Sequence, residues 1–343
     1  MIKNVIICDD SSFARKQMAR AIPDTLNAEI EFANHGAEAM ELLNSGFGEL
    51  MFLDLNMPVM DGYDTLEAIE RGDYDVDIIV VSGDIQPEAK ARVQALGAIE
   101  FIKKPIDQSA LTKILIELQI IEDSPQNQEP ESKPAIEQLK KDTEQKSLSF
   151  VETYQEVANI AMGQAADLLA RLLDVFVVLP IPKVNILEYS ELQMLLRDTT
   201  RDEKCSVICQ GFIGFGISGE ALLFFNDSSV EDIAQLMRYD QAVGETLELE
   251  LLMDVSSILI GACLNGFANQ LDIQFSQGHP IVLGKHVQVD EILKSNTQPW
   301  KKSLAIEINY AIEGRSINCD LLILFTEDSM SDLEKRSAYL LEA

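Results

Sequence analysis

The sequence predicts an α/β fold, in which a doubly wound, mostly parallel sheet of five strands is followed by an α+β domain built from two internal repeats. Two observations predict it. Between residues 1 and 121, short apolar runs alternate five times with amphipathic segments, which is the pattern of successive β-α units. In the C-terminal part, a stretch of sequence recurs in register 98 residues further on. A chain of 343 residues is long enough for two domains with separate cores.

The first domain is expected to contain five strands and five helices. The apolar runs that predict the strands are Val5–Cys8, Ile30–Phe32, Leu50–Leu53, Ile78–Val81 and Glu100–Ile102. The segments that predict the helices lie near 12–22, 36–44, 63–71, 86–96 and 107–120. In sheets of this kind, the ligand site lies outside the carboxyl ends of the strands.

A change of composition marks the end of this domain. From Glu122 onward the chain carries three prolines among Gln, Glu and Lys residues, with few apolar side chains. Such a composition is typical of a linker. We therefore expect a first domain over 1–121, a linker over 122–146 and a second domain over 147–343.

The second domain is expected to begin with a long amphipathic helix, from near Ser147 past Leu173. Its strands are predicted at about 205–213, 219–225, 303–312 and 317–325. A turn at Glu313-Gly314-Arg315 joins the last two. The two repeats then cover about 147–240 and 245–340.

Several positions carry the repeat. Glu152, Ile160 and Gly163 recur 98 residues later as Glu250, Ile258 and Gly261. Each strand pair is also followed by an acidic helix start, once at 227–232 and again at 328–332. The strand pairs and these helix starts recur at an offset of 100, so two copies of one structural unit are expected.

The charge and the cysteines exclude some classes of function. A formal net charge of −30 argues against nucleic acid and against an anionic membrane surface. A DNA-binding regulator is disfavoured because no basic recognition helix is found. The five cysteines form no CxxC pair, so buried, reduced thiols are expected. The longest apolar stretch, Ile258 to Ala268, is shorter than a membrane span, and we expect a cytoplasmic protein without membrane insertion.

Acidic residues follow two of the predicted strands. Asp9 and Asp10 come after the first and Asp54 after the third, while Ser82 ends the fourth and Lys104 follows the fifth. These ends converge in a parallel sheet, so the carboxylates should lie within a few ångströms of one another. Clustered carboxylates repel unless a cation neutralises them, and oxygen ligands suit Mg²⁺. A carboxylate flanked by a metal and a lysine is arranged to accept a phosphoryl group.

This part of the chain resembles a known family. The matching residues are Asp9-Asp10, Asp54 followed by Met57-Pro58 and Met60-Asp61-Gly62, Ser82, and Lys104-Pro105. Together they resemble the receiver domain of response regulators, the CheY-like domain with a flavodoxin-like fold. The resemblance covers about 1–121.

The resemblance implies a role for each matched residue. Asp54 would be phosphorylated by a histidine kinase, and Mg²⁺ would be held by Asp9, Asp10, Asp54 and the backbone of Asn56. In the same way, Ser82 and Lys104 would contact the phosphoryl group.

Two further features are implied around the fifth strand. The resemblance implies a cis peptide bond between Lys104 and Pro105. Phe101 takes the place of the aromatic residue that swings inward on activation in the family. From its spacing alone, Phe101 is equally well explained as an ordinary core aromatic.

A second candidate site lies on the long helix of the second domain. Glu156 and Asn159 are three residues apart, so both side chains project from one face of the helix. A carboxylate can pair with a lysine, and a carboxamide can hold a water in line with a scissile bond, which is what hydrolysis of an acyl phosphate needs. The alternative is a solvated helix face, because the motif is short. Pro182 follows Asn159 after 22 residues, and this frame recurs from Asp254 and Ser257 to Pro280.

This frame resembles the CheC/CheX/FliY family of response-regulator phosphatases, over about 147–343. The resemblance implies that Glu156 pairs with the lysine of a bound phospho-receiver and that Asn159 positions the attacking water. One departure is Glu152, which stands where the family often has Asp or Ser. In the second copy, Asp254 is one methylene shorter than Glu and Ser257 lacks the carboxamide, so we expect this site to be weak or dead.

These observations predict a chemotaxis response regulator of the two-component type. Its second domain would dephosphorylate the phospho-aspartate of receiver domains, under control of its own Asp54. The expected partners are a histidine kinase and a phosphorylated CheY-like receiver. The first domain could be the regulator of the phosphatase, or its substrate across the linker. The alternative is a non-enzymatic, phosphorylation-controlled adaptor that binds chemotaxis or flagellar-switch proteins.

Overall fold

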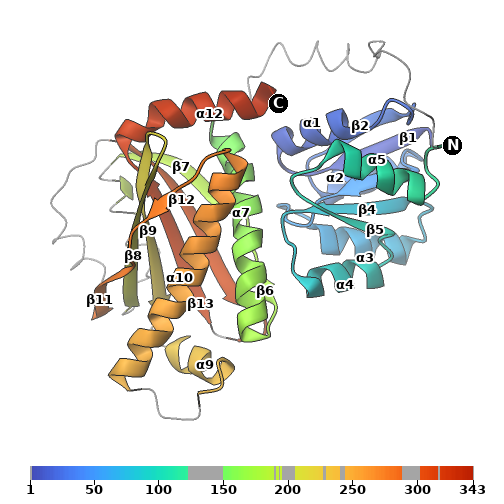
Figure 1. The fold of residues 1–343 in the computed structure, drawn as a ribbon. Helices are drawn as coiled ribbons and strands as arrows, with labels where there is room; N and C mark the ends of the chain where they lie inside the picture. Colours follow the sequence, from blue (N-terminus) through green and yellow to red (C-terminus); the bar gives the residue numbers. More distant parts are fainter. Residues whose placement is uncertain are drawn as a thin grey trace. The chain divides into compact units, whose positions relative to one another are not determined.

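The computed structural model describes residues 2–122, 150–188, 191–192, 194, 205–226, 229–239, 244–287, 302–315 and 317–342 (Figure 1). The chain forms two compact units, and the boundary between the first unit and the long helix of the second falls near Thr153. Almost all of the predicted linker, 122–146, lies outside the described residues, as do residues 147–149 at the expected start of the long helix.

The first unit is a five-stranded, fully parallel sheet in the order β2-β1-β3-β4-β5. Its strands are β1 (Asn4–Cys8), β2 (Glu29–Ala33), β3 (Leu50–Leu53), β4 (Asp77–Ser82) and β5 (Glu100–Lys103). Its helices are α1 (Ser12–Ala21), α2 (Gly36–Asn44), α3 (Gly62–Gly72), α4 (Pro87–Ala95) and α5 (Gln108–Glu117). The predicted strands and helices are confirmed, and most of their ends agree within a residue or two.

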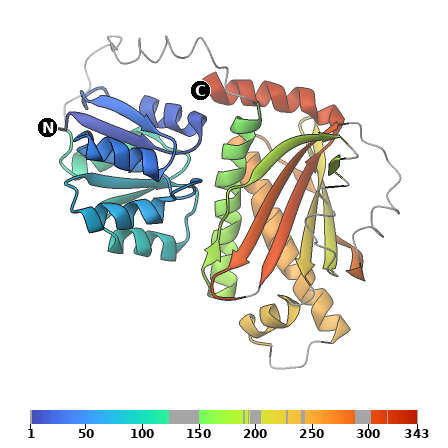
Figure 2. The same ribbon diagram turned by 180° about the vertical axis from the view of Figure 1, so that it is seen from behind.

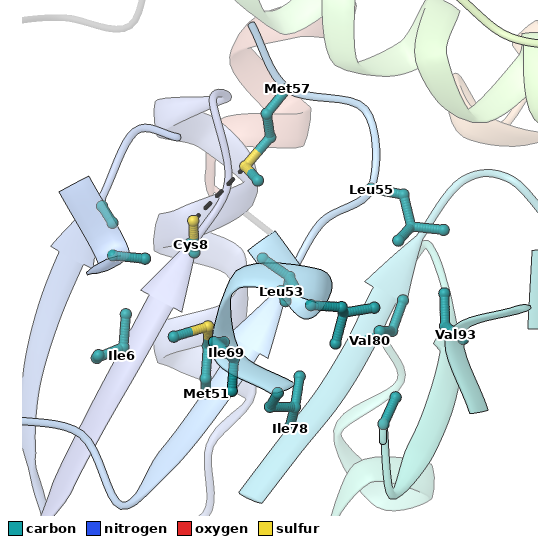
Figure 3. Packing of buried hydrophobic residues seen from close by; sticks show 14 of the residues in the cluster. Ile6, Cys8, Met51, Leu53, Leu55, Met57, Ile69, Ile78, Val80 and Val93 are labelled. Atoms are coloured by element: carbon teal, nitrogen blue, oxygen red, sulfur yellow. Dashed lines mark hydrogen bonds between the residues drawn. The ribbon is translucent and has the colours of Figure 1, made fainter. Parts of the chain in front are cut away.

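The central strands of this sheet are apolar on both faces because helices cover both. One face buries residues such as Ile6, Met51 and Val80 (Figure 3). The other face buries Ile7 and Phe52 with further side chains. In the sequence, strands that are buried on both faces appear as continuous apolar runs, without an alternation of polar and apolar residues. The carboxyl ends of β1, β3 and β4 are therefore fixed by packing on two sides.

The second unit repeats one series of elements. The first copy contains α7 (Phe150–Leu173), β6 (Val177–Val178), β7 (Lys183–Glu188), β8 (Cys205–Gly214), β9 (Ile217–Asn226) and α9 (Ser229–Leu236). The second contains α10 (Glu245–Gln270), β10 (Ser276–Gln277), β11 (Ile281–Val287), β12 (Lys302–Ile312), β13 (Asn318–Phe325), the 3₁₀ turn η1 (Glu327–Ser329) and α12 (Met330–Glu342). The order of helix, strands, hairpin and helix occurs twice, which confirms an α+β region with an internal repeat.

The two copies share one sheet of eight strands. Its main path is β10-β8-β9-β13-β12-β6, while β11 pairs with β8 and β7 pairs with β12. Each hairpin is thus flanked by an edge strand of the other copy. At the centre, Leu222 is paired with its own equivalent, Leu322, between β9 and β13. The copies are therefore related by an approximate twofold axis and complete each other's sheet.

The offset of 100 is also visible in two equivalent hydrogen bonds. The backbone N–H of Asn318 donates to Ser229 Oγ (3.4 Å), and the N–H of Ser218 donates to Ser329 Oγ (2.8 Å). Each serine at a helix start thereby accepts a hydrogen bond from a strand backbone N–H of the other copy. Residues 227 and 228 of the first predicted helix start lie outside the described part of the chain.

The helices α7 and α10 cover one face of this sheet (Figures 1 and 2). The prediction that the first helix runs past Leu173 is wrong. Asp174 adopts a left-handed conformation (φ 55°) and the N–H of Val175 donates to Ala170 O (3.2 Å), which ends the helix.

The helix α10 is longer than its longest apolar stretch because it continues through acidic residues. Its segment Thr246–Gln270 is long and apolar enough to cross a membrane, with a mean hydropathy of 1.7 over its most apolar 18-residue window. However, 61% of that window is buried inside the protein. Burial against the sheet accounts for its apolar character, as in the core helix of a globular domain.

Candidate functional site

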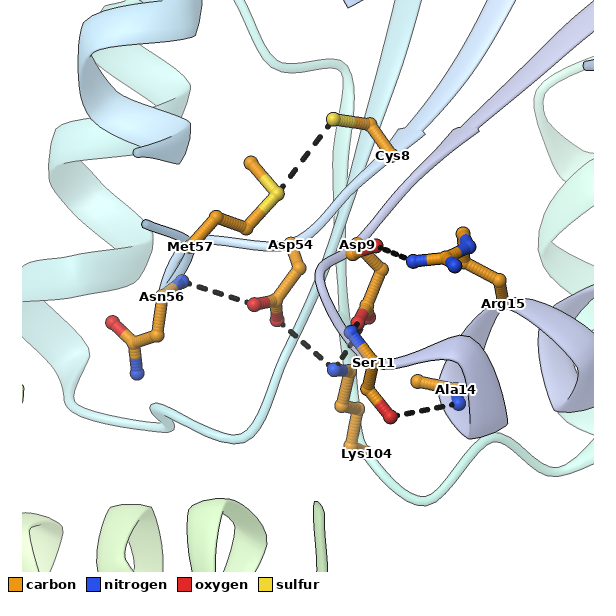
Figure 4. Close-up of polar contacts among 9 residues, drawn as sticks. All are labelled: Cys8, Asp9, Ser11, Ala14, Arg15, Asp54, Asn56, Met57 and Lys104. Atoms are coloured by element: carbon orange, nitrogen blue, oxygen red, sulfur yellow. Dashed lines mark hydrogen bonds and ion pairs between the residues drawn. The ribbon is translucent and has the colours of Figure 1, made fainter. Parts of the chain in front are cut away.

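Three carboxylates meet at the carboxyl edge of the first unit's sheet. Asp9 follows β1 and Asp54 follows β3 (Figure 4). The ligand atoms of Asp9, Asp10 and Asp54 lie within 4.8 Å of one another. Asp9 and Asp54 are buried, with 5% and 1% of their surfaces exposed. The predicted convergence of these residues is confirmed.

Lys104 reaches the same point from the end of β5. Its Nζ lies 2.7 Å from Asp9 Oδ2 and 3.1 Å from Asp54 Oδ1 (Figure 4). Its backbone N–H donates to the carbonyl of Ser82 (2.9 Å), and the bond to Pro105 is cis, as the resemblance implied. A buried ammonium is stable only with such partners.

Backbone groups orient both buried carboxylates. The N–H of Ser11 donates to Asp9 Oδ1 (2.8 Å), and the N–H of Asn56 donates to Asp54 Oδ2 (3.0 Å). In addition, Arg15 Nη1 donates to the backbone carbonyl of Asp9 (2.5 Å) (Figure 4). The role of Arg15 was not predicted, because nothing in its spacing distinguishes it from a surface residue of α1.

A close backbone approach holds the loop after Asp54. A Cβ added to Gly62 would lie 2.4 Å from the carbonyl oxygen of Asp54, so only glycine fits there. The preceding Asp61 caps α3 by accepting from the N–H of Asp64 (2.8 Å). The Asp61-Gly62 pair of the sequence motif thus places α3 directly against the strand end that carries Asp54.

The cluster fits a hard divalent cation. Asp9, Asp10 and Asp54 carry three negative charges and the Lys104 ammonium one positive charge, which leaves a local charge of about −2 at neutral pH. All three side chains offer carboxylate oxygens, the donors that Mg²⁺ prefers. These residues would hold the ion, and its two positive charges would balance the negative charge of the cluster.

Cys8 lies beside this cluster and was not predicted to be part of it. Its Sγ donates to Met57 Sδ at 3.6 Å (Figures 3 and 4). Burial, together with the negative charges of Asp9 and Asp54, raises the pKa of the Cys8 thiol. The thiol therefore stays protonated and serves as a packing group rather than a nucleophile.

Ser82 and Phe101 lie where the sequence placed them. Ser82 ends β4 and is fully buried. Phe101 lies on β5, partly buried against the core cluster that contains Val80. Both residues therefore lie on the strands that the sequence predicted for them.

The second candidate site lies on α7 of the second unit. Glu156 and Asn159 are both buried, with 3% and 6% of their surfaces exposed. Within the described part of the chain, Asn159 Oδ1 has no hydrogen-bond partner. An unsatisfied buried acceptor is costly and needs an explanation, and a bound water or ligand would supply one.

The equivalent site on α10 differs in exposure as well as in residue type. Asp254 and Ser257 are both exposed. The Ser257 hydroxyl donates to the carbonyl of Met253 (2.7 Å), so its hydrogen is used within the helix itself. This serine does not offer the donor and acceptor pair that a carboxamide would.

The comparisons with known families and sequences match the first unit. Residues 5–116 match the response regulator receiver domain. A protein-glutamate methylesterase/protein-glutamine glutaminase of Pyrococcus abyssi is 37% identical over 108 residues, covering 29% of this chain and 28% of that protein. The Bacillus subtilis protein of the same name is 32% identical over 121 residues, covering 34% of each. The chain thus spans only about a third of the length of these relatives.

Two solved structures show partial similarity to the chain. The FliY structure of Thermotoga maritima is 17% identical, with a TM-score of 0.43, and the match covers 57% of this chain and 99% of that one. A CheX-CheY-BeF3-Mg+2 complex from Borrelia burgdorferi contains a chain that is 28% identical, with a TM-score of 0.32, over 34% of this chain and 89% of that one.

Proposed function

We propose that this chain, whose first unit is a response-regulator receiver domain, is a chemotaxis signalling phosphatase that hydrolyses the phospho-aspartate of receivers. Phosphorylation of its own Asp54 controls that activity. The observation that carries the proposal is the side chain of Asn159, a buried carboxamide whose oxygen has no partner among the described residues, one helical turn from the buried carboxylate of Glu156.

The first half of the proposal is phosphorylation of Asp54. An Asp54 oxygen attacks the phosphorus of a kinase phosphohistidine, so a P–O bond forms while the P–N bond breaks and imidazole leaves. When bound by Asp9, Asp10, Asp54 and the backbone of Asn56, Mg²⁺ supplies positive charge to the phosphoryl oxygens. The Lys104 ammonium, 3.1 Å from Asp54 Oδ1, and the Ser82 hydroxyl stabilise the product.

The second half is hydrolysis of a receiver's acyl phosphate at α7. Glu156 pairs with the receiver's lysine and so positions the phosphoryl group against the helix. The Asn159 carboxamide holds a water in line, and the water oxygen attacks phosphorus as the P–O bond to the aspartate breaks. The aspartate leaves as a carboxylate, and the water's protons go to phosphate and solvent. The receiver provides the metal ion and the lysine, so the phosphatase contributes only the positioning of the water and the phosphoryl group.

The test is the decay of a separately phosphorylated, free-standing receiver with Mg²⁺ and this protein. We expect faster decay with wild type and a loss on the order of a hundredfold in Asn159→Ala. An Asp54→Ala chain then reports how the receiver unit controls the rate. Equal decay rates with wild type, with Asn159→Ala and without protein would contradict the proposed phosphatase activity.

A second candidate function is a phosphorylation-controlled adaptor. It is favoured by α10, where the equivalents of Glu156 and Asn159 are Asp254 and Ser257, a pair that cannot hold a water in the same way. An adaptor would bind phospho-receivers and lengthen the life of the phosphoryl group. Slower decay in the same assay would support this function over hydrolysis.

A further inference from the structure

We propose that Arg15 is a positioning residue for the Mg²⁺ site of the first unit. Through the backbone carbonyl of Asp9, it fixes the peptide group that directs the Asp10 carboxylate toward the ion. This inference rests on the proposed function, because it takes Asp9, Asp10 and Asp54 as ligands of Mg²⁺. It adds a residue of α1 that acts on the ion through the backbone of its ligands.

The turn between β1 and α1 is held at its start by two strands. The carbonyl of Cys8 accepts a hydrogen bond from the N–H of Asp54, which follows β3 (2.9 Å). The N–H of Asp9 donates to the carbonyl of Ala33, the last residue of β2 (3.1 Å). The peptide group between Cys8 and Asp9 is therefore fixed on both sides by the sheet.

The next peptide group, between Asp9 and Asp10, is the one that Arg15 holds. Arg15 Nη1 donates to the carbonyl oxygen of Asp9 at 2.5 Å (Figure 4). Because a peptide group is planar, a fixed carbonyl also fixes the direction in which the chain enters Asp10. Asp10 is partly exposed, whereas Asp9 and Asp54 are buried among neighbouring side chains. Asp10 is thus the ligand whose direction depends most on its own backbone.

The helix α1 gives the Arg15 side chain a fixed starting point. Ser11 caps the helix, since its Oγ accepts from the N–H of Ala14 (3.1 Å). The N–H of Arg15 donates to the carbonyl of the same serine (3.0 Å). Met18 is buried and packs α1 into the core. From this helix, the Arg15 side chain reaches back six residues along the chain to the Asp9 carbonyl.

The charge of Arg15 and its hydrogen bond have opposite effects on a bound cation. A positive charge near the carboxylates disfavours a second cation, so on charge alone the removal of Arg15 should strengthen Mg²⁺ binding. Part of this charge acts on Glu38, whose pKa is lowered mainly by hydrogen bonds from Asn34 and also by Arg15. If the hydrogen bond positions a ligand, removal of Arg15 should instead weaken Mg²⁺ binding. The sign of the change distinguishes the two roles.

The first measurement is the Mg²⁺ affinity of the full-length chain, by calorimetric titration with MgCl₂. An Asp10→Ala chain gives the background binding of the other acidic residues, and it is subtracted. We expect Arg15→Met to bind Mg²⁺ about tenfold more weakly than wild type. Arg15→Lys keeps a donor and the charge and should stay within about threefold of wild type. Lys16→Met is the matched control, because it removes the same charge from the next residue of α1, and it should not weaken binding.

The rate of Asp54 phosphorylation by acetyl phosphate separates positioning from a structural role. Arg15→Met should raise the Mg²⁺ concentration at half-maximal rate about tenfold, while the rate at saturating Mg²⁺ stays within about threefold of wild type. A urea melt in EDTA checks that this variant is folded. If it is not, Arg15→Gln takes its place, since its amide is too short to reach the Asp9 carbonyl.

Two results would overturn the inference alone. One is a Mg²⁺ affinity of Arg15→Met equal to or tighter than that of wild type. The other is a lower rate at saturating Mg²⁺ with an unchanged half-maximal concentration, which a structural role would produce. If wild type itself binds no more Mg²⁺ than Asp10→Ala does, the proposed metal site fails and the inference fails with it.

Discussion

The Lys104 ammonium lies 3.1 Å from Asp54 Oδ1. Asp54 follows β3 and Lys104 follows β5, and β4 lies between these two strands in the sheet. The same ammonium lies 2.7 Å from Asp9 Oδ2. One buried cation is therefore shared by two buried carboxylates, and the third carboxylate, Asp10, lies close by. This arrangement offsets part of the negative charge of the two buried carboxylates, while it leaves enough negative charge to attract a divalent cation.

Replacing Lys104 by methionine keeps the volume and removes the charge. The local charge then falls from about −2 to about −3, so the three carboxylates repel more strongly and we expect a loss of about 3 kcal/mol in the free energy of unfolding without metal. Mg²⁺ should bind more tightly and recover part of the loss. Urea melts of wild type and Lys104→Met, each with EDTA and with Mg²⁺, measure both effects. An equal Mg²⁺ response in the two proteins would contradict the shared-cation account.

Gly62→Ala should destabilise the first unit by about 1–3 kcal/mol and lower Asp54 phosphorylation, because its Cβ would lie 2.4 Å from the Asp54 carbonyl. Phosphorylation by acetyl phosphate and a urea melt give the two readouts. Gly244→Ala is the control, since no described atom lies within 4 Å of its Cβ position. The close-approach explanation is wrong if the two variants lose the same amount.

The cysteines should resist alkylation in the native protein. All five are buried and none forms a disulfide, and burial raises the pKa of Cys209 and Cys263 to about 12. At pH 8, about one such thiol in ten thousand is ionised. We expect no iodoacetamide labelling of the native chain and full labelling in urea, as counted by mass spectrometry. Rapid native labelling of any of these thiols would show that it is not buried.

Glu38 should link stability to pH at the start of α2. Hydrogen bonds from the backbone and side chain of Asn34 (both 2.8 Å) lower the pKa of its carboxyl group. A depressed folded pKa gives stability that is present above the unfolded value, about 4.3, and is lost as the pH falls through the folded value. Glu38→Gln should therefore lower the urea midpoint slightly at neutral pH, and the difference should vanish in acid. A difference that stays constant with pH would exclude this linkage.

The first unit could be predicted closely because its signals are local. Apolar runs such as Leu50–Leu53 mark buried strands, and parallel topology brings the residues after them together. Asp9, Asp54 and Lys104 were placed in one cluster for this reason. The contributions of Arg15 and Cys8 were missed, because side-chain contacts with a backbone carbonyl or a thioether leave no pattern in the sequence.

The second unit was harder to predict. The repeat indicated two copies, but it could not show that β7 pairs with β12 of the other copy. The choice of partner depends on which sheet edge is free, which is a property of the whole fold. The strands β6, β7, β10 and β11 were all missed, and β6 and β10 have only two residues each, which is too short to carry a periodicity. The helix α10 was foreseen only in part, since its acidic residues interrupt the apolar stretch.

The central claim is that Asn159 catalyses hydrolysis of a receiver's phospho-aspartate, and two full-length variants test it most directly. The substrate is Asn159→Ala, phosphorylated on Asp54 with acetyl phosphate and Mg²⁺ and freed of donor. The added enzyme is Asp54→Ala, which retains Glu156 and Asn159. In a separate sample, the decay of phosphorylated wild type is measured without any other protein, to detect hydrolysis within one chain. We predict that phosphate release rises with Asp54→Ala concentration, or that phospho-wild-type decays on the order of a hundredfold faster than phospho-Asn159→Ala. Identical lifetimes in all three samples would contradict the claim.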